Sequence, residues 1–549
     1  TANTTGSANT AVGSLALDAN TIGGENTAVG YGSLGSNTEG SGNTVVGYAA
    51  LDASTTASSN TAIGRAALGA TTGGDNNSAL GYNALLSNTT GNQNVAVGAY
   101  AGDAITDADY NVAVGVNALG ANTLGSRNVA VGQQALQSAN VTSAADTYNT
   151  ALGYAAGGAV TTGTGNTLMG GLAGDALTDA DNNVAIGYSS LGANTVGSRS
   201  TAIGTYALEV QNPASAANMY NTALGYGSGQ SVTTGIQNTL IGGLAGDAIT
   251  DADYNVAVGY NALTANTVGS RAVAVGYAAL QKQNPASAAD SYNTAIGHAS
   301  GGEITTGVNN TFVGGLAGDA TDDGAGNTAM GFAALSSNCG DGNVAVGSSA
   351  GISITGASNT VMGNAAGYAV TSGSNNLLLG KDAGRSGSPG GNIATGSNEM
   401  VLGDENITQA HIQVDWTVAS DARDKTDFTA LDLGLEFVKD LQPVTYKWDK
   451  RSKYGDKTAE DYDLNAQTPD GTHKEDWLDI GFKAQEVEAL EIAAGYNKDN
   501  NTNLVSSHTG DGKQMGLQYS KFVPILVKAI QEQQALIESL TARITTLEG

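Results

Sequence analysis

A five-residue unit of the form Asn-Thr/Val-Ala-Val/Ile/Leu-Gly returns along most of the chain at an almost constant step of about 17 residues, which indicates a repeat architecture. Its first copies start at Asn9, Asn26, Asn43, Asn60, Asn77, Asn94, Asn111 and Asn128. A second short segment such as YGSL or YNAL, and a polar turn with Gly and Asn, complete each copy. Two short strands with glycine corners in so short a coil are typical of a narrow β-solenoid or β-roll, because Gly accepts the positive-φ corners.

Some copies are longer, and the longer copies are themselves periodic. The step from Asn128 to Asn149 is longer than those before it. The whole pattern then repeats after about 72 residues, as the GLAGDA segments at Gly171, Gly243 and Gly315 show. The additional residues lie in QSANVTSAADTY, VQNPASAANMY and KQNPASAADSY. We expect them to form a row of bulges. Loops on a regular scaffold often carry recognition, but they are equally compatible with decoration.

The composition favours a thin, repeating core. The chain has 78 Gly in 549 residues, and only 5% of its residues are aromatic. We predict two inward-facing aliphatic ladders and a stack of Asn side chains that satisfies backbone groups of the turns. The first ladder is predicted at Val29, Val46, Ile63, Val97, Val114 and Val131. The second is predicted at Leu34, Leu51, Leu68, Leu85, Leu119 and Leu136. Because so thin a solenoid is marginally stable alone, we expect a homotrimer that buries a second face.

The charge distribution restricts the possible partners. Residues 1–419 contain 7 Lys and Arg against 27 Asp and Glu, which argues against nucleic acid and anionic membranes as ligands. No apolar run approaches about 20 residues, so we expect no membrane insertion. The sequence opens inside a repeat, and we expect an attachment region to precede it.

An acidic motif, D-A-x-T-D-A-D, recurs with the longer of the two periods. Three carboxylates within seven residues could bind Ca²⁺, which favours several oxygen ligands. The alternative is a solvated turn whose carboxylates cap backbone groups. The candidate ligands are Asp103, Asp107, Asp109, Asp175, Asp179, Asp181, Asp247, Asp251 and Asp253. No other cofactor is expected.

The repeat ends near Gly396, so we predict three regions: a repetitive β-rod over 1–397, a β-rich connector over 398–419, and an α+β domain over 420–549. The last region ends in a helix with heptad spacing, which predicts a coiled coil at about 523–547. The two heptad positions hold Val523, Ile530, Ile537 and Ile544, and Leu526, Gln533, Leu540 and Leu547. The alternative is an amphipathic helix that packs on its own domain.

The third region begins with Ser420-Asp-Ala-Arg-Asp-Lys425. A serine hydroxyl becomes a good nucleophile only when a base removes its proton, and a lysine can do so if burial lowers its pKa. Five residues separate Ser420 from Lys425, which lets them meet across a turn. This spacing alone is not specific for catalysis.

Residues 420–549 resemble the C-terminal intramolecular chaperone domain of endosialidase-type phage tail spikes and fibres. The resemblance is carried by the Ser-Asp-x-Arg-x-Lys motif at 420–425, by YKW at Tyr446–Trp448, by GFKAQEV at Gly481–Val487 and by the terminal heptads. It implies a domain that trimerises the fibre, helps it fold and then releases itself by a single self-cleavage, with no turnover. Ser420 would be the nucleophile, Lys425 the base and Ser420–Asp421 the scissile bond, with Asp421 and Arg423 orienting the loop.

The repeats are similar to those of phage fibres and of the heads of trimeric autotransporter adhesins. We therefore expect a phage tail fibre, made in the host cytoplasm and carried extracellularly on the virion. Its partners would be other virion tail proteins and a host cell-surface receptor, either polysaccharide or protein. The alternative is a bacterial surface trimeric adhesin without cleavage, which should end in a membrane anchor. A capsule depolymerase would need a globular catalytic insertion, for which the repeat leaves no room before residue 397.

Overall fold

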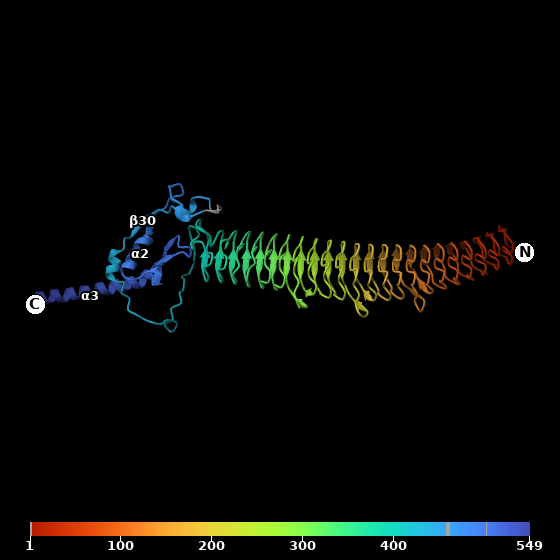
Figure 1. Ribbon diagram of the computed structural model, residues 1–549, viewed down its shortest axis with the longest axis horizontal. Helices are drawn as coiled ribbons and strands as arrows, with labels where there is room; N and C mark the ends of the chain where they lie inside the picture. The colour runs from red at the N-terminus through yellow and green to blue at the C-terminus, as the bar shows by residue number, and fades with distance from the viewer. Residues whose placement is uncertain (1–2, 415, 457–461, 501) are drawn as a thin grey trace. The chain divides into compact units, whose positions relative to one another are not determined.

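The computed structural model describes the chain except residues 1–2, 415, 457–461 and 501 (Figure 1). It divides into two compact units, Thr1–Asn327 and Thr328–Gly549. The first unit is a parallel β-solenoid, and the second contains further solenoid coils followed by a small α+β region. Equivalent asparagines of successive coils, such as Asn94 and Asn111, are 17 residues apart and in contact. The predicted fold class, a β-solenoid of short repeated coils and then an α+β region with a C-terminal helix, is confirmed.

Each coil of the first unit contributes one three-residue strand to a parallel sheet, in which equivalent residues of successive coils pair directly, for example Thr27 with Thr44. These strands are β1 (Thr10–Val12), β2 (Thr27–Val29), β3 (Thr44–Val46), β4 (Thr61–Ile63), β5 (Ser78–Leu80), β6 (Val95–Val97), β7 (Val112–Val114), β9 (Val129–Val131), β11 (Thr150–Leu152), β12 (Thr167–Met169), β13 (Val184–Ile186), β15 (Thr201–Ile203), β17 (Thr222–Leu224), β18 (Thr239–Ile241), β19 (Val256–Val258), β21 (Val273–Val275), β23 (Thr294–Ile296) and β24 (Thr311–Val313).

Three longer coils add two-residue strand pairs, and their loops leave the solenoid along one side of Figure 1. The pairs are β8 (Gly125–Ser126) with β10 (Ala145–Asp146), β14 (Gly197–Ser198) with β16 (Ala217–Asn218), and β20 (Gly269–Ser270) with β22 (Ala289–Asp290). The predicted bulges are therefore confirmed.

One predicted ladder faces the wrong way. From β2 onward the middle residue of each solenoid strand is buried, whereas the first and third residues are partly or fully exposed. The predicted inward ladder Val29, Val46, Ile63, Val97, Val114 and Val131 occupies the third position and therefore faces outward. Successive side chains of a strand point to opposite faces, so a three-residue strand places only its centre inside. That centre is usually Ala, and the predicted leucine ladder, which is buried, fills the remaining space.

Close stacking explains the glycine that ends each repeat unit. Gly30 has φ of +134°, and a Cβ there would lie 2.3 Å from the carbonyl oxygen of Gly47 in the next coil. A side chain at this corner would therefore force neighbouring coils apart.

The predicted asparagine stack is confirmed. Asn94 is buried, its backbone N–H donates to Oδ1 of Asn77 at 2.9 Å, and its own Oδ1 accepts from the N–H of Asn111 at 2.9 Å. Its Nδ2 donates to the carbonyl oxygen of Ala108 at 2.8 Å. The side chain of Asn94 thus links the turn of its own coil to the next coil, and its backbone N–H is bonded in the same way by the side chain of the coil before.

Within the second unit the solenoid coils contribute parallel strands that pair in chain order, β25 (Thr328–Met330), β26 (Val344–Val346), β27 (Thr360–Met362), β28 (Leu377–Leu379) and β29 (Met400–Leu402). β29 pairs with β28, so the solenoid extends past residue 397 into the predicted connector. β29 is the one strand of that connector among its described residues.

In its described residues the α+β region contains short 3₁₀ turns, three α-helices and two antiparallel strand pairs. They are η1 (Ala422–Asp424), α1 (Leu435–Asp440), β30 (Val444–Tyr446), η2 (Arg451–Lys453), η3 (Leu464–Ala466), β31 (Asp479–Gly481), α2 (Ala484–Ala493), η4 (Lys498–Asn500), β32 (Ser506–His508), β33 (Met515–Leu517), η5 (Tyr519–Lys521) and α3 (Phe522–Glu548). The core consists of Leu433, Phe437, Leu441, Val487, Val505, Phe522 and Ile525. No helix in the described part of the chain is long and apolar enough to cross a membrane.

The start of α3 packs in this core, while its later heptad positions remain exposed. Glu532 on α3 accepts a hydrogen bond from the N–H of Leu435 at 2.7 Å, which joins α3 to α1. Beyond this contact Ile537, Leu540 and Ile544 are about half exposed, at 49%, 53% and 54%. The helix is confirmed, and the coiled coil stays a prediction.

We predict that Asn94→Ala weakens the solenoid locally. It leaves the buried N–H of Asn111 and the carbonyl of Ala108 without their side-chain partner, at about 1–3 kcal/mol for each group. Hydrogen exchange should show the Asn111 amide losing protection, whereas Gln93→Ala, at an exposed position of the same coil, should leave it protected. Equal protection in the two variants would contradict a structural role for the stack.

Candidate functional site

The candidate site is a short loop at the start of the α+β region. Asp421 caps η1: its Oδ1 accepts from the N–H of Arg423 at 2.9 Å. Aspartate is a preferred N-cap residue because its side chain satisfies an N–H that the turn leaves free. The single 3₁₀ turn that follows reverses the chain between Ser420 and Lys425.

The turn brings Ser420 and Lys425 together. Nζ of Lys425 lies 2.6 Å from Oγ of Ser420 and 3.4 Å from the carbonyl oxygen of the same serine. The prediction that the two side chains meet across a turn is confirmed. In this arrangement a neutral lysine amine can accept the hydroxyl proton, and a protonated one can stabilise negative charge on the carbonyl oxygen.

Asp421 and Arg423 hold the loop with a forked ion pair. Nε of Arg423 lies 3.1 Å from each carboxylate oxygen, and Nη2 lies 2.6 Å from Oδ2. The hydrogen bond from Arg423 holds the pKa of Asp421 below its usual value, and the same bond raises the pKa of Arg423. The geometry agrees with the predicted orienting role, which stays a prediction.

The site is open to water in a single chain. Every residue from Ser420 to Lys425 is exposed. A lysine acts as a base only when it is deprotonated, and burial is the usual means of reaching that state at neutral pH. In the single chain Ser420 and Lys425 are therefore in contact, but they are not shielded from water.

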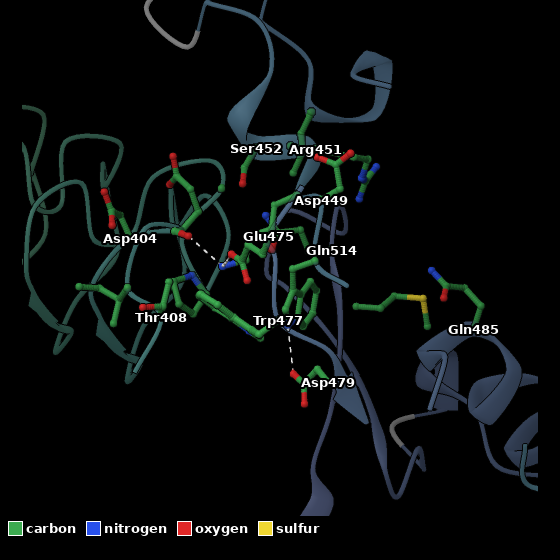
Figure 2. Close-up of a pocket in the computed structure, with 18 residues that line it drawn as sticks. Asp404, Thr408, Asp449, Arg451, Ser452, Glu475, Trp477, Asp479, Gln485 and Gln514 are labelled. Carbon is green, nitrogen blue, oxygen red and sulfur yellow. Dashed lines mark hydrogen bonds and ion pairs between the residues drawn. The ribbon is translucent and has the colours of Figure 1, made fainter. Parts of the chain in front are cut away.

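A polar pocket that the sequence did not indicate lies elsewhere in the second unit (Figure 2). Trp448, Trp477 and Lys450 line it, together with Asp404 and Glu405, which precede Ser420 in the chain. Nζ of Lys450 donates to the carbonyl oxygen of Glu405 at 2.9 Å. The pocket thus combines residues from both sides of the proposed cut. Because these residues are far apart in the sequence, no local motif indicates the pocket.

Glu475 is a charged group of the pocket with little exposure to water. Its side chain is 9% exposed, and Oε1 lies 3.7 Å from Nζ of Lys450 and 3.9 Å from Nζ of Lys453. The same oxygen has no hydrogen-bond partner. These distances describe an ion pair without direct hydrogen bonds.

The carboxylates of the acidic motifs mostly accept hydrogen bonds from the turns of neighbouring coils. Oδ1 of Asp109 accepts the backbone N–H of Asn92 at 2.6 Å, and Asp181 and Asp253 accept equivalent N–H groups of the preceding coils. Oδ1 of Asp107 accepts the hydroxyl of Thr90 at 2.9 Å.

The other carboxylates of these motifs have local roles as well. Asp179 and Asp251 accept the hydroxyls of the threonines before them, and Asp247 accepts that of Thr264. Partial burial raises the pKa of Asp103 and of Asp175. Among the described residues, no three His, Cys, Asp or Glu side chains converge as metal ligands, and Ca²⁺ binding stays a prediction.

We predict that the carboxyl group of Asp421 titrates below the ordinary aspartate value of about 3.9. Because its pKa is depressed, the ion pair is intact above that value and is lost as the pH falls through the depressed pKa. A ¹³C NMR titration in the Ser420→Ala background, where the bond before Asp421 stays intact, should show the midpoint returning to the ordinary value when Arg423→Gln is added. Lys439→Gln, which removes a cation paired with Glu436 elsewhere, should leave it unchanged. A normal midpoint in the Ser420→Ala chain itself would contradict the fork.

Comparison with known families agrees with this geometry. Residues 420–496 match the peptidase S74 family, described as the chaperone of endosialidase. No curated protein and no solved structure matches the chain. The match begins at Ser420 and includes β30 and β31, which pair antiparallel with Tyr446 opposite Asp479 and Val444 opposite Gly481. The chain thus joins a β-solenoid to a region that is similar, over residues 420–496, to the chaperone of endosialidase.

Proposed function

We propose that the chain is the subunit of a homotrimeric phage tail fibre that adheres to the host cell surface. Its C-terminal domain would drive trimerisation and folding and then release itself by one cut between Ser420 and Asp421. The observation that carries this proposal is the 2.6 Å contact between Lys425 and Ser420 at the first residue of the family match.

The proposed cut places a chemical requirement on the attacking group. Within one residue the Ser420 hydroxyl would have to attack its own carbonyl carbon through a strained four-membered ring. The attacking hydroxyl therefore belongs to Ser420 of a second chain, or to water activated at the pair. Lys425 lies beside the carbonyl oxygen that would become negative, which fits either route.

Two exposed apolar surfaces of each chain support the trimer. The third strand residue of every coil is apolar and faces outward, which forms a continuous stripe along the sheet. The heptad seam of α3 is the second surface. Exposed apolar area costs about 25 cal/mol per Å², so both surfaces favour partners. Parallel chains around one axis would cover both. The number of chains rests on the family resemblance, because Ile and Leu at these heptad positions also suit two strands.

Adhesion is supported by the combination of a solenoid shaft with a chaperone of this type. The receptor would be a cell-surface polysaccharide or protein, and other tail proteins of the virion would hold the fibre. The fibre would be made in the host cytoplasm and act extracellularly. A trimeric bacterial adhesin remains the alternative, and it would not cut itself.

We predict that the expressed chain separates into two fragments and that Ser420→Ala, Lys425→Ala and Lys425→Arg stay whole. Arginine keeps the charge of Lys425 but cannot give up its proton at neutral pH. Lys439→Ala, an exposed lysine of the same region, should be cut like the unmodified chain. Electrophoresis and mass spectrometry should find a C-terminal fragment that begins at Asp421. An intact unmodified chain would refute self-cleavage, and a fragment that begins at Ser420 would refute this position of the cut.

We predict that the chain in the Ser420→Ala background sediments at three times its mass of 54.6 kDa. Ile537→Asp combined with Ile544→Asp should weaken the assembly strongly, because each aspartate would bury a charge in the seam. Glu538→Gln, at an exposed neighbouring position, should not change it. Analytical ultracentrifugation measures the outcome, and a monomer in the Ser420→Ala background would exclude the trimer.

A further inference from the structure

The arginines of the solenoid share one environment. Residues 1–419 contain five arginines, and each stacks on at least one tyrosine ring. Three of them, Arg127, Arg199 and Arg271, occupy the same place in the long period and lie in the coils that precede the three loops. The few arginine side chains of this acidic solenoid therefore lie beside tyrosine rings, and three of them do so at intervals of the long period.

Two of these positions have the same geometry. The guanidinium carbon of Arg127 lies 4.8 Å from the ring centre of Tyr110 in the coil before it and 5.9 Å from that of Tyr148 in the coil after it. Nε of Arg127 lies 2.9 Å from Oδ2 of Asp146, and the hydroxyl of Tyr148 donates to the same oxygen at 3.2 Å.

The copy around Arg271 repeats this arrangement. Its guanidinium carbon lies 5.1 Å from the ring centre of Tyr254 and 5.8 Å from that of Tyr292. Asp290 pairs with Arg271 and accepts from the hydroxyl of Tyr292 at 3.0 Å. In the middle copy Arg199 stacks on Tyr220 and donates to its hydroxyl at 2.7 Å, but Asn218 replaces the aspartate.

The backbone at these positions is unfavourable for such side chains. Arg127 and Tyr148 have φ of +62° and +52°, in the left-handed region that large side chains rarely adopt. Equivalent positions of other coils hold residues as different as Gly42, Glu25 and Gln93, all at positive φ. The turn therefore forms without Arg or Tyr, and the placing of these two residue types side by side at intervals of the long period is independent of what the turn requires.

The loops complete each group and leave it accessible. β10 pairs with β8 and carries Asp146 to Arg127 of the preceding coil. The tyrosines stay close to half exposed, with 48% for Tyr110, 58% for Tyr148, 45% for Tyr254 and 54% for Tyr292. Exposed aromatic rings beside an ion pair form a surface with an apolar body and hydrogen-bonding edges.

We propose that these three groups bind neutral sugar units of a surface polysaccharide. The exposed parts of the tyrosine rings can pack against sugar C–H groups, and the guanidinium and carboxylate can bond sugar hydroxyls as donor and acceptor. Arg127 and Arg271 are each already neutralised by an aspartate. Residues 1–419 also carry 27 acidic against 7 basic side chains, and both facts disfavour an acidic glycan. The groups lie four coils apart, at about 19 Å for strands spaced by about 4.8 Å, and this regular spacing suits a repeating polymer.

Sugar binding at these groups would provide the proposed adhesion to the host cell, and its biological role rests on that proposed function. The test applies the full-length Ser420→Ala protein to an array of neutral and acidic bacterial-surface oligosaccharides. We expect retention by at least one neutral glycan. Retention should fall at least tenfold when Tyr148, Tyr220 and Tyr292 are all replaced by Ala.

The matched control replaces Tyr31, Tyr154 and Tyr188, which are exposed tyrosines outside the three groups, by Ala, and it should bind like the unmodified protein. Circular dichroism and sedimentation of each variant separate lost binding from lost structure. Retention of acidic glycans alone, no retention at all, or an equal loss in the control would overturn the inference. Binding to whole host cells is measured in parallel. If cell binding persists in the triple variant, adhesion stands and these sites do not mediate it.

Discussion

The structure of the solenoid depends on the buried asparagine stack. A coil this short has too little interior to satisfy its turns with backbone pairs alone. The side chain of Asn94 bonds its own turn at Ala108 and the next coil at Asn111, and its backbone N–H donates to the side chain of Asn77 in the coil before. Because buried backbone groups without partners are costly, coils linked in this way must remain in register. The direct pairing of equivalent residues along the sheet follows from this constraint.

Exact register has a consequence for the outer face. Side chains at the same position of successive repeats stack on one another and form a column along the solenoid. The interior holds only the strand centre, usually Ala, and the leucine of the turn, so the larger apolar residues of the third position form an outward stripe. The same rule turns isolated residues such as Arg127 and Tyr148 into stacked neighbours. A fold this thin thus exposes much of its apolar surface, and a partner that covered the stripe would add stability.

The sequence was sufficient for the period, the asparagine stack, the buried leucines and the meeting of Ser420 with Lys425, because each depends on local spacing. It was insufficient to predict whether the side chains of Val29 and its equivalents point into the core or toward solvent. The alternation Thr-Ala-Val fits either face, and only the size of the interior decides between Ala and Val. The pocket around Glu475 could not be predicted either, because its lining residues are far apart in the chain. Arg127 and Asp146 were visible in the sequence, but their contact depends on where the loop turns back.

Cleavage at Ser420 would not by itself separate the two parts of the second unit. Lys450 binds the carbonyl of Glu405 at 2.9 Å, and the N–H of Asn392 donates to Asp511 at 3.0 Å. Both contacts join residues before Ser420 to residues after it, and neither involves the scissile bond. Hydrogen bonds with a charged partner contribute about 1.5–3 kcal/mol each, so a cut chain retains part of its attachment. Cleavage and release are therefore distinct steps, and release requires these contacts to break as well.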